Sequence, residues 1–196
     1  MKPIILASRS PRRQELLLGL GWKFTIADPG IDEQNGAGEA PRQLCRRLAL
    51  EKAKAVSVKF PESIVIGADT IVVLEGKVLG KPANLQESSE MIKALSGKKH
   101  EVMTGVAVCL GEHCAVELET TRVFFRTLDL AEIESYVATG EGLDKAGAYA
   151  IQGKGALLVS GIEGCYFNVV GLPLPRLSFM LEGFGLTLSS QWGEDE

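Results

Sequence analysis

The apolar positions of this chain form short runs, and between them lie stretches with a helical repeat. Apolar runs bounded by turn residues predict strands, here over residues 3–7, 23–27, 63–74, 100–110 and 114–126. Helical stretches cover residues 11–19, 41–59, 85–95, 131–138 and 175–181. Strands alternate with helices and the last two strands read as a hairpin, so the class is α/β with a mixed sheet. No linker divides the chain, so we expect one domain over 1–196, with 190–196 as a frayed polar tail.

Composition narrows the possible classes of function. Of 196 residues, 45% are hydrophobic and 23% are charged, which is typical of a folded soluble protein. The net charge of −4 implies no general polyanion-binding surface, so we do not expect nucleic acid as a partner. No apolar stretch approaches the roughly 20 residues of a membrane span, so no membrane partner is expected either. Any positively charged site must therefore be local.

The cysteines form no CxxC pair and no metal-ligand spacing. The four positions are Cys45, Cys109, Cys114 and Cys165. Cys109 and Cys114 can face each other across the predicted hairpin, but in a reducing cytosol such a pair stays as thiols. We therefore expect all four cysteines to be packing residues. His100 and His113 lie in or beside strand-like runs, away from the other candidate residues, and we interpret them as ordinary strand residues.

An arginine-rich motif follows the first predicted strand. Residues 8–13 read Ser-Arg-Ser-Pro-Arg-Arg, in which Ser10 suits the N-cap of a helix and the next residue, a proline, suits its first position. Arg12 and Arg13 then fall in the first turn, where the helix dipole makes cations unfavourable. Exposed amides together with arginine side chains form an anion site, and phosphate is the expected anion. The alternative is that the arginines reach outward to surface carboxylates such as Glu15.

The predicted helix over 41–59 carries a lysine within its apolar stripe. Residues at i, i+3 and i+4 spacing share one helical face. On this helix that face holds Cys45, Leu48, Ala49, Lys52 and Val56. A lysine in such a stripe either snorkels to its edge or points into a cleft. The spacing alone favours neither alternative for Lys52.

Asp69 interrupts the apolar run over 63–74. An acid flanked by strand residues is costly unless it is paired or faces a polar cleft. In open α/β sheets ligands collect at strand ends, which makes Asp69 a candidate functional acid. The alternative is a structural aspartate that caps a turn. Glu33 and Lys81 are weaker signals when taken singly, because charged loop residues are usually just solvated.

These residue types share one chemical logic. Arginines and lysines stabilise phosphate charge, acids hold a divalent cation or deprotonate water, and glycine-rich loops admit a base and a sugar. The chain has no Walker sequence and no Gly-x-Gly-x-x-Gly unit between a strand and a helix. The pattern indicates phosphoryl hydrolysis without a covalent intermediate, in which positioning and electrostatics supply most of the rate.

Blocks of sequence along nearly the whole chain resemble the Maf nucleotide pyrophosphatases. In chain order they are Ser8–Leu17, Ile31–Glu33, Glu51–Ala53, Gly67–Val72, Gly80–Pro82, Asp144–Gly153 and Asn168–Leu174. Each block alone is a weak signal, but their shared order is specific.

The resemblance implies a cytoplasmic enzyme that cleaves a nucleoside triphosphate between the α- and β-phosphates. The products would be a monophosphate and pyrophosphate, and the activity would prevent incorporation of non-standard nucleotides. The resemblance also implies a divalent metal cation, Mg²⁺ or Mn²⁺. The implied fold is an elongated mixed sheet flanked by helices, Maf/ITPase-like, with an active-site cleft between two lobes, often in a homodimer.

The resemblance also assigns roles to matching residues. Asp69 would be the base that activates water, and Glu33 would lie with Asp69 at the metal. The positions that match phosphate contacts are Ser10, Arg13, Lys52 and Lys81. Of these, we expect Arg13 and Lys52 to be catalytic together with Asp69.

Three further positions indicate the branch of the family. Arg12, Thr70 and Gln152 match the specificity positions of members that resemble dTTP/UTP pyrophosphatases, so dTTP and UTP are the expected substrates. A competing hypothesis from another class is a nucleotide-binding regulator of septum formation or cell division. An intact Asp69 with Glu33 favours catalysis, because binding alone needs no base.

Overall fold

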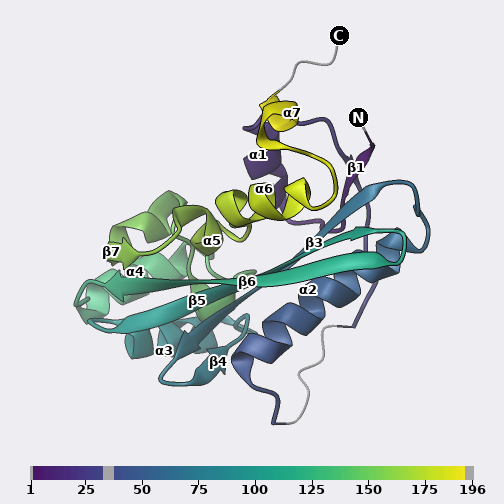
Figure 1. Cartoon of the computed structure of the whole chain (residues 1–196). Helices are drawn as coiled ribbons and strands as arrows, with labels where there is room; N and C mark the ends of the chain where they lie inside the picture. Colours follow the sequence, from purple (N-terminus) through teal and green to yellow (C-terminus); the bar gives the residue numbers. More distant parts are fainter. Residues whose placement is uncertain (1, 33–37, 193–196) are drawn as a thin grey trace. The chain divides into compact units, whose positions relative to one another are not determined.

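The computed structural model describes residues 2–32 and 38–192 and contains a mixed sheet flanked by helices (Figure 1). The strands are β1 (Ile4–Leu6), β2 (Thr25–Ile26), β3 (Ile64–Leu74), β4 (Lys77–Leu79), β5 (Lys99–Leu110), β6 (His113–Phe125) and β7 (Val159–Glu163). The helices are α1 (Pro11–Leu18), α2 (Pro41–Ser57), α3 (Leu85–Leu95), α4 (Leu130–Ala138), α5 (Tyr166–Val170), α6 (Leu174–Glu182) and α7 (Leu188–Trp192). Two 3₁₀ helices are η1 (Ala146–Ala148) and η2 (Gly153–Leu158).

The sheet is mixed, as predicted. Within the described residues its hydrogen-bonded order is β2-β1-β3-β5-β6-β7, and β4 pairs with β3. Strand β1 runs parallel to both β2 and β3, whereas β4 is antiparallel to β3 and β7 is antiparallel to β6. The predicted α/β class with a mixed, helix-flanked sheet is therefore confirmed.

The chain divides into two compact units. The first unit comprises residues up to Asp69, Thr104–Glu119 and the chain from Gly171 onward; the second comprises Thr70–Met103 and Thr120–Val170. The cleft between two lobes that the resemblance implies stays a prediction, and so does the single-domain organisation.

In the first unit, alternate strand residues supply two apolar layers. Because successive side chains of a strand point to opposite faces, Ile4 and Leu6 join one buried cluster with α1 and α6, whereas Ile5 joins another with α2. The same alternation holds in β3, where Ile64 and Ile66 belong to the first cluster and Val65 to the second. The layer against α2 positions the site described below.

The second unit has its own core. Residues from β3, β5 and β6 pack there with α3 and α4, and an aromatic group lies among them. The ring of His100 meets those of Phe125 and Tyr149 edge-on at centroid distances of 5.1 and 5.3 Å. Its Nε2 lies 2.6 Å from the Tyr149 hydroxyl. His100 is therefore a buried and partnered core residue, where the sequence had suggested only an ordinary strand position.

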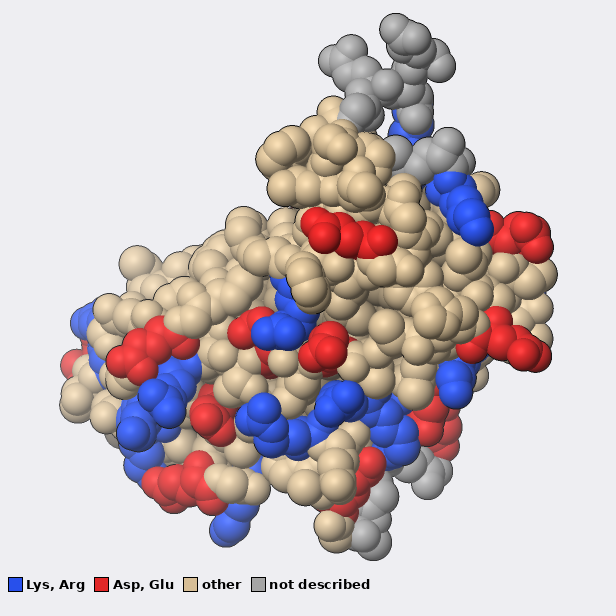
Figure 2. Space-filling view, viewed as in Figure 1, with Lys and Arg blue, Asp and Glu red and all other residues tan. Residues whose placement is uncertain are grey.

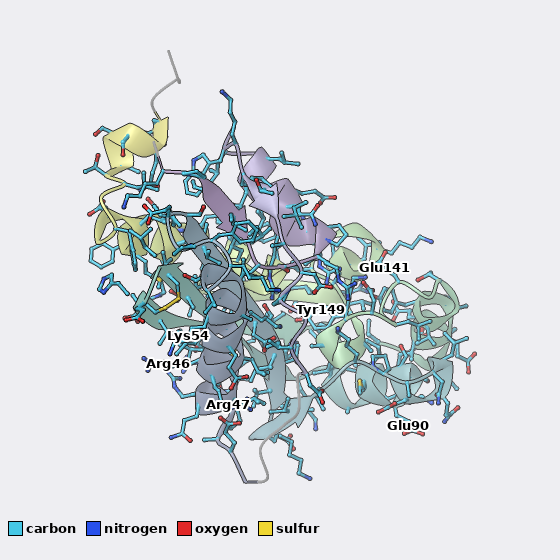
Figure 3. All side chains as sticks on the ribbon, turned by 90° about the vertical axis from the view of Figure 1, so that its right-hand side faces the viewer. Arg46, Arg47, Lys54, Glu90, Glu141 and Tyr149 are labelled. Carbon is cyan, nitrogen blue, oxygen red and sulfur yellow. A yellow bond between two sulfur atoms is a disulfide. The ribbon has the colours of Figure 1, made fainter. Side chains whose placement is uncertain are left out.

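The predicted disposition of Cys109 and Cys114 as thiols is wrong. They form a disulfide, visible as a yellow bond in Figure 3, with their Cα atoms 4.2 Å apart. Strands β5 and β6 are sheet neighbours joined by only two residues, which brings these positions opposite each other. Cys45 and Cys165 take no part in this disulfide, and the thiol of Cys45 does more than pack.

Helix α7 includes residues that the sequence had placed in a frayed tail. Residues 190–192, expected in a frayed tail, belong to α7. The reason is Gln191, whose buried side chain donates to the carbonyl oxygens of Leu186 and Ser178 at 2.8 and 3.2 Å. The main-chain carbonyl of Gln191 accepts from the indole N–H of Trp22 at 3.2 Å, which ties α7 to the segment after α1 within the first unit. These long-range contacts cannot be read from a polar tail.

The surface agrees with the modest net charge. Figure 2 shows Lys and Arg lying among Asp and Glu on the face in view. None of the helices in the described ranges is long and apolar enough to cross a membrane.

Candidate active site

Two glycines bring helix α2 close to the sheet of the first unit. A Cβ atom on Gly67 of β3 would lie 2.5 Å from the carbonyl oxygen of Ala49, and one on Gly105 of β5 would lie 2.3 Å from that of Cys45. Real Cβ atoms essentially never come so close, so only glycine permits this packing. The backbone of α2 therefore lies directly against both strands, within reach of short side chains.

The apolar stripe predicted on α2 is buried, and it includes the lysine. Cys45, Leu48, Ala49, Lys52 and Val56 are all buried. The predicted shared face is thus confirmed. Because the lysine is enclosed with its apolar neighbours, the snorkelling alternative does not hold.

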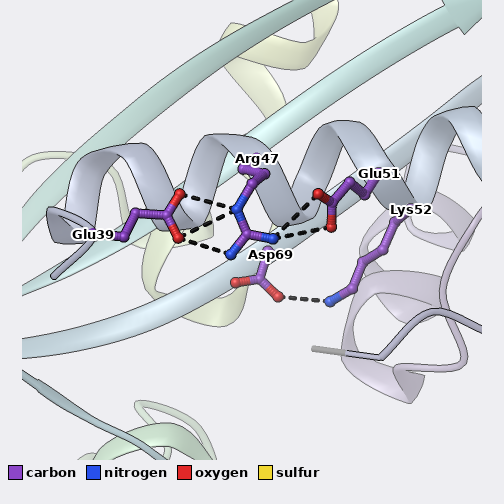
Figure 4. Close-up of polar contacts among 5 residues, drawn as sticks. All are labelled: Glu39, Arg47, Glu51, Lys52 and Asp69. Carbon is purple, nitrogen blue, oxygen red and sulfur yellow. Dashed lines mark hydrogen bonds and ion pairs between the residues drawn. The ribbon is translucent and has the colours of Figure 1, made fainter. Parts of the chain in front are cut away.

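Lys52 reaches Asp69 across this interface. Its Nζ lies 2.6 Å from Asp69 Oδ1, and the two side chains are 7% and 8% exposed (Figure 4). Asp69 stands within β3, so it does not cap a turn. Desolvating two charges costs several kcal/mol per ion, and the attraction within the pair only offsets that cost. The pair is therefore poor evidence for stability and better evidence for a functional site.

The thiol of Cys45 fixes the backbone beside the pair. It donates to the Asp69 carbonyl oxygen at 3.0 Å and accepts from the Gly105 N–H at 3.0 Å. Burial, helped by the charge of Asp69, raises the Cys45 pKa to about 12, so the thiol keeps its proton and remains a donor. Sequence reasoning assigned Cys45 to packing alone. Its place two turns before Lys52 on the same face was the available signal.

Arg13 turns toward the interior of the first unit. Its Nε donates to the Gly171 carbonyl at 2.7 Å, and Nη1 donates to Ser8 Oγ at 3.2 Å. The Ser8 Oγ also accepts from the Ser10 N–H at 3.2 Å. Ser8 is buried, and sequence reasoning missed it as a site residue. For Arg13, the alternative of an outward contact with Glu15 is not what the structure records.

Ser10 occupies the predicted N-cap position of α1, but its side chain makes no capping hydrogen bond. The predicted N-cap position is therefore confirmed, and the following proline stands at the start of the helix as predicted. The Ser10 N–H instead bonds to Ser8, and Arg12 lies half-buried in the first turn.

The charges of Arg13, Lys52 and Asp69 all act on the thiol of Cys45. Arg13 and Lys52 both lower the Cys45 pKa, whereas Asp69 raises it, so all three lie within electrostatic range of the same thiol. Two cations and one carboxylate leave a surplus of positive charge. Such a group is suited to an anion, and the phosphate site expected from the sequence stays a prediction.

A second charged cluster joins Arg47 and Glu51 of α2 to Glu39, which precedes the helix. Arg47 donates to Glu39 at 2.7–3.2 Å and to Glu51 at 3.1–3.2 Å (Figure 4). These hydrogen bonds, the one to Glu39 more than the one to Glu51, raise the pKa of Arg47 above its ordinary value. The Arg47 guanidinium thus holds the Glu39 carboxylate against the helix. Glu33, predicted at the metal, lies outside the described residues, and its role stays a prediction.

Three predicted site residues belong to the second unit. Thr70 is half-buried in β3, directly after Asp69 along the chain, and Lys81 is exposed after β4. Gln152 is half-buried and extended, immediately before η2. Their predicted substrate contacts stay predictions.

A divalent cation fits the donor chemistry of the site. Mg²⁺ is usually held by one or two carboxylates together with substrate phosphates, rather than by a full protein cage. Asp69 supplies one such carboxylate beside cations suited to phosphate. In residues 2–32 and 38–192, no group of three or more His, Cys, Asp or Glu converges on one point.

Comparisons with known proteins agree over most of the chain. Residues 3–184 match the family described as Maf-like protein. A dTTP/UTP pyrophosphatase from Symbiobacterium thermophilum is 53% identical over 185 residues, covering 94% of this chain and 95% of that protein. A protein of the same name from Moorella thermoacetica is 51% identical over 195 residues, covering 98% and 99%.

A solved structure gives a more distant likeness. The Ham1 protein of Staphylococcus aureus aligns with a TM-score of 0.52 at 13% identity, covering 93% of this chain and 100% of that one. At this identity the likeness concerns the fold alone.

Proposed function

Since this chain belongs to the Maf family, we propose that it is a nucleotide pyrophosphatase that hydrolyses dTTP and UTP to the monophosphate and pyrophosphate. Relatives about half identical over nearly their whole length carry that name, which supports the assignment. The observation that carries it in this molecule is the buried Lys52–Asp69 pair at 2.6 Å. An ion pair that adds little stability, beside a second inward-turned cation, is typical of a catalytic anion site.

Asp69 is the general base in this proposal. A carboxylate has two oxygens, so the bond from Lys52 to Oδ1 is compatible with Oδ2 accepting a proton from water. Lys52 orients the carboxylate of Asp69, and the Cys45 thiol holds the main-chain carbonyl of the same residue. A base held at two points loses little freedom when it takes up the reactive geometry.

Arg13 stabilises phosphate charge. Its guanidinium is aimed by the Gly171 carbonyl and by Ser8, so its orientation is set before substrate arrives. Preorganised cations are most effective where negative charge grows in the transition state, here on the phosphate oxygens. Ser10 and Lys81 are further phosphate contacts in this proposal.

The proposal includes a divalent cation, Mg²⁺ or Mn²⁺, held by Asp69 and Glu33. When bound, it would neutralise phosphate charge and act as a Lewis acid. The residues around it bind the triphosphate, orient it and move the proton of water.

Arg12, Thr70 and Gln152 select the base and sugar. Uracil and thymine present carbonyl acceptors beside an imide N–H, and the Gln152 amide can match that edge with one donor and one acceptor. The arginine can donate to a carbonyl but cannot accept from the amino group of cytosine. Unmet buried polar groups cost about 1–3 kcal/mol each, so cytosine is disfavoured.

We propose that the enzyme works in the cytoplasm, with its nucleotide as the partner rather than nucleic acid or a membrane, and that it forms a homodimer. Removal of non-standard pyrimidine nucleotides would keep them out of nucleic acids.

The deciding experiment measures steady-state product release. Purified protein with Mg²⁺ or Mn²⁺ is given UTP, dTTP, CTP, ATP and GTP, and the products are identified. We expect equal amounts of monophosphate and pyrophosphate from UTP and dTTP, and little from the others. Tight nucleotide binding without turnover would instead favour the regulator of septum formation or cell division. Faster cleavage of GTP than of UTP would refute the substrate assignment alone.

A further inference from the structure

Gln152 lies in a segment whose backbone is held on both sides by residues from α4 and the turn after it. On the C-terminal side, the Glu141 carboxylate accepts from two successive amides: Oε2 from the Lys154 N–H at 3.0 Å and Oε1 from the Gly155 N–H at 2.9 Å. Glu141 is labelled in Figure 3. Both bonds are charge-assisted, which makes them stronger than neutral ones.

On the N-terminal side, the anchor is a hydroxyl. The Tyr136 hydroxyl takes a hydrogen bond from the backbone N–H of Ala150 and lies 3.4 Å from Glu141 Oε1, to which it donates. Burial raises the pKa of Tyr136, so the hydroxyl keeps the proton that it donates. The hydroxyl and the carboxylate therefore form one connected polar group.

Two glycines make room for this group. A Cβ atom on Gly153 would lie 2.8 Å from Glu141 Oε2. One on Gly155 would lie 2.3 Å from the Ala150 carbonyl oxygen and 3.0 Å from the Tyr136 hydroxyl. Gly153 also has a φ of 65°, which suits glycine far better than other residues. The segment is thus shaped to close around the carboxylate and the hydroxyl.

We propose that Glu141 and Tyr136 are positioning residues for base selection, acting through Gln152; this rests on the proposed function. A glutamine amide carries a donor and an acceptor on the same group. Turned over, it offers the opposite pattern, which suits the amino group and ring nitrogen of cytosine. Selection of uracil therefore depends on one fixed amide orientation. Anchors at residue 150 and at residues 154–155 hold the backbone from which Gln152 projects.

The test is the ratio of kcat/KM for UTP to kcat/KM for CTP. Glu141→Gln keeps the size of the side chain but turns an amino group toward N–H donors. We expect the ratio to fall about tenfold, a loss near 1.4 kcal/mol, while kcat for UTP falls less. The control is Glu163→Gln, which removes an exposed carboxylate of the same unit that pairs only with Arg122 among the described contacts. Its ratio should stay within about twofold of wild type.

A double-mutant cycle separates positioning from a general structural role. If Glu141 acts through Gln152, then Glu141→Gln/Gln152→Ala has the same ratio as Gln152→Ala alone. A UTP-to-CTP ratio lower in the double variant than in Gln152→Ala would overturn the proposal. A Glu141→Gln protein with a lower melting temperature but an unchanged ratio would also overturn it. Tyr136→Phe removes only the hydroxyl and is the second variant if Glu141→Gln does not fold; an unchanged ratio there would equally overturn the proposal.

Failure of the proposed function itself would give other results than failure of the positioning role. In that case wild type would not hydrolyse UTP, or Gln152→Ala would leave the ratio unchanged. An unchanged ratio in Glu141→Gln with a reduced ratio in Gln152→Ala would refute only the positioning role.

Discussion

Lys52 of α2 and Asp69 of β3 form an ion pair of 2.6 Å in which both side chains are buried. The helix that supplies the lysine also supplies Cys45, whose thiol binds the Asp69 carbonyl. One helix thus holds both the carboxylate and the backbone of a single acid. The glycines of β3 and β5 that admit this helix are as necessary to the site as the charged residues themselves.

Asp69→Asn should abolish most turnover. The substitution keeps the size of the side chain but removes the charge of the proposed base, and loss of a general base typically costs about 100- to 10,000-fold in rate. The measurement is kcat with UTP, well below the melting temperature. Glu75→Gln is the control, since Glu75 is an exposed acid paired with Lys98. A variant that kept more than about a tenth of wild-type turnover would remove Asp69 from the role of base.

The same substitution should also destabilise the protein. It leaves the Lys52 charge buried without its counter-ion, and breaking a buried pair on one side costs about 3–5 kcal/mol. Lys52→Met/Asp69→Asn should recover most of that loss in urea unfolding, because an apolar side chain suits the stripe, yet remain inactive. A double variant that recovered activity together with stability would show that the pair is structural.

Arg13→Ala should lower triphosphate turnover more than monophosphate binding. The guanidinium is oriented before substrate binds, so we expect its loss to cost at least about 100-fold in kcat with UTP. Binding of UMP, measured by calorimetry, should weaken much less. Arg9→Ala is the control, because Arg9 belongs to the same motif but forms an exposed pair with Asp28. Equal losses in turnover and UMP binding would indicate general affinity instead.

Cys45→Ala should cost stability through two lost hydrogen bonds. It leaves the buried N–H of Gly105 without the thiol acceptor, a penalty of about 1–3 kcal/mol in the free energy of unfolding. Cys45→Ser should lose less, because a hydroxyl also donates and accepts. Cys165→Ala is the control, since Cys165 meets Thr121 through its backbone. Equal stability of Cys45→Ala and Cys45→Ser would show that the hydrogen bonds contribute little.

Stability should depend on pH through His100. Burial lowers its pKa in the folded protein from 6.5 to about 4. Between these values the unfolded chain binds a proton that the folded chain does not. The contribution of neutral His100 to the free energy of unfolding is therefore complete above pH 6.5. It falls by about 3 kcal/mol as the pH drops to 4 and then levels off.

Urea unfolding at pH 7.5 and 5.0 measures this dependence. His100→Gln should remove much of the difference between the two pH values, whereas His113→Gln, which changes an exposed position, should retain it. A wild-type protein equally stable at both pH values would contradict the buried, neutral His100.

Much of the local structure was available from the sequence. The apolar runs predicted the mixed α/β class and the hairpin of β5 and β6, and α3 was predicted with its observed bounds. Elements with little apolar repeat were not predicted: β4, β7 and α5 are short and depend on tertiary pairing, and β2 is shorter than expected. Short segments carry too few positions for a periodic signal.

The sequence by itself determined which residue types were available and which of them shared a face. It placed Lys52 in a buried stripe and Asp69 in a strand, because helical and strand periods depend only on local backbone geometry. Only the tertiary structure decided what each side chain meets. It paired Lys52 with Asp69, joined Cys109 to Cys114, placed Ser8 between Arg13 and the Ser10 N–H, and closed the segment around Glu141. These partners lie far apart in the chain or depend on a particular turn, and such contacts form only when helices and strands pack at distances that no local pattern encodes.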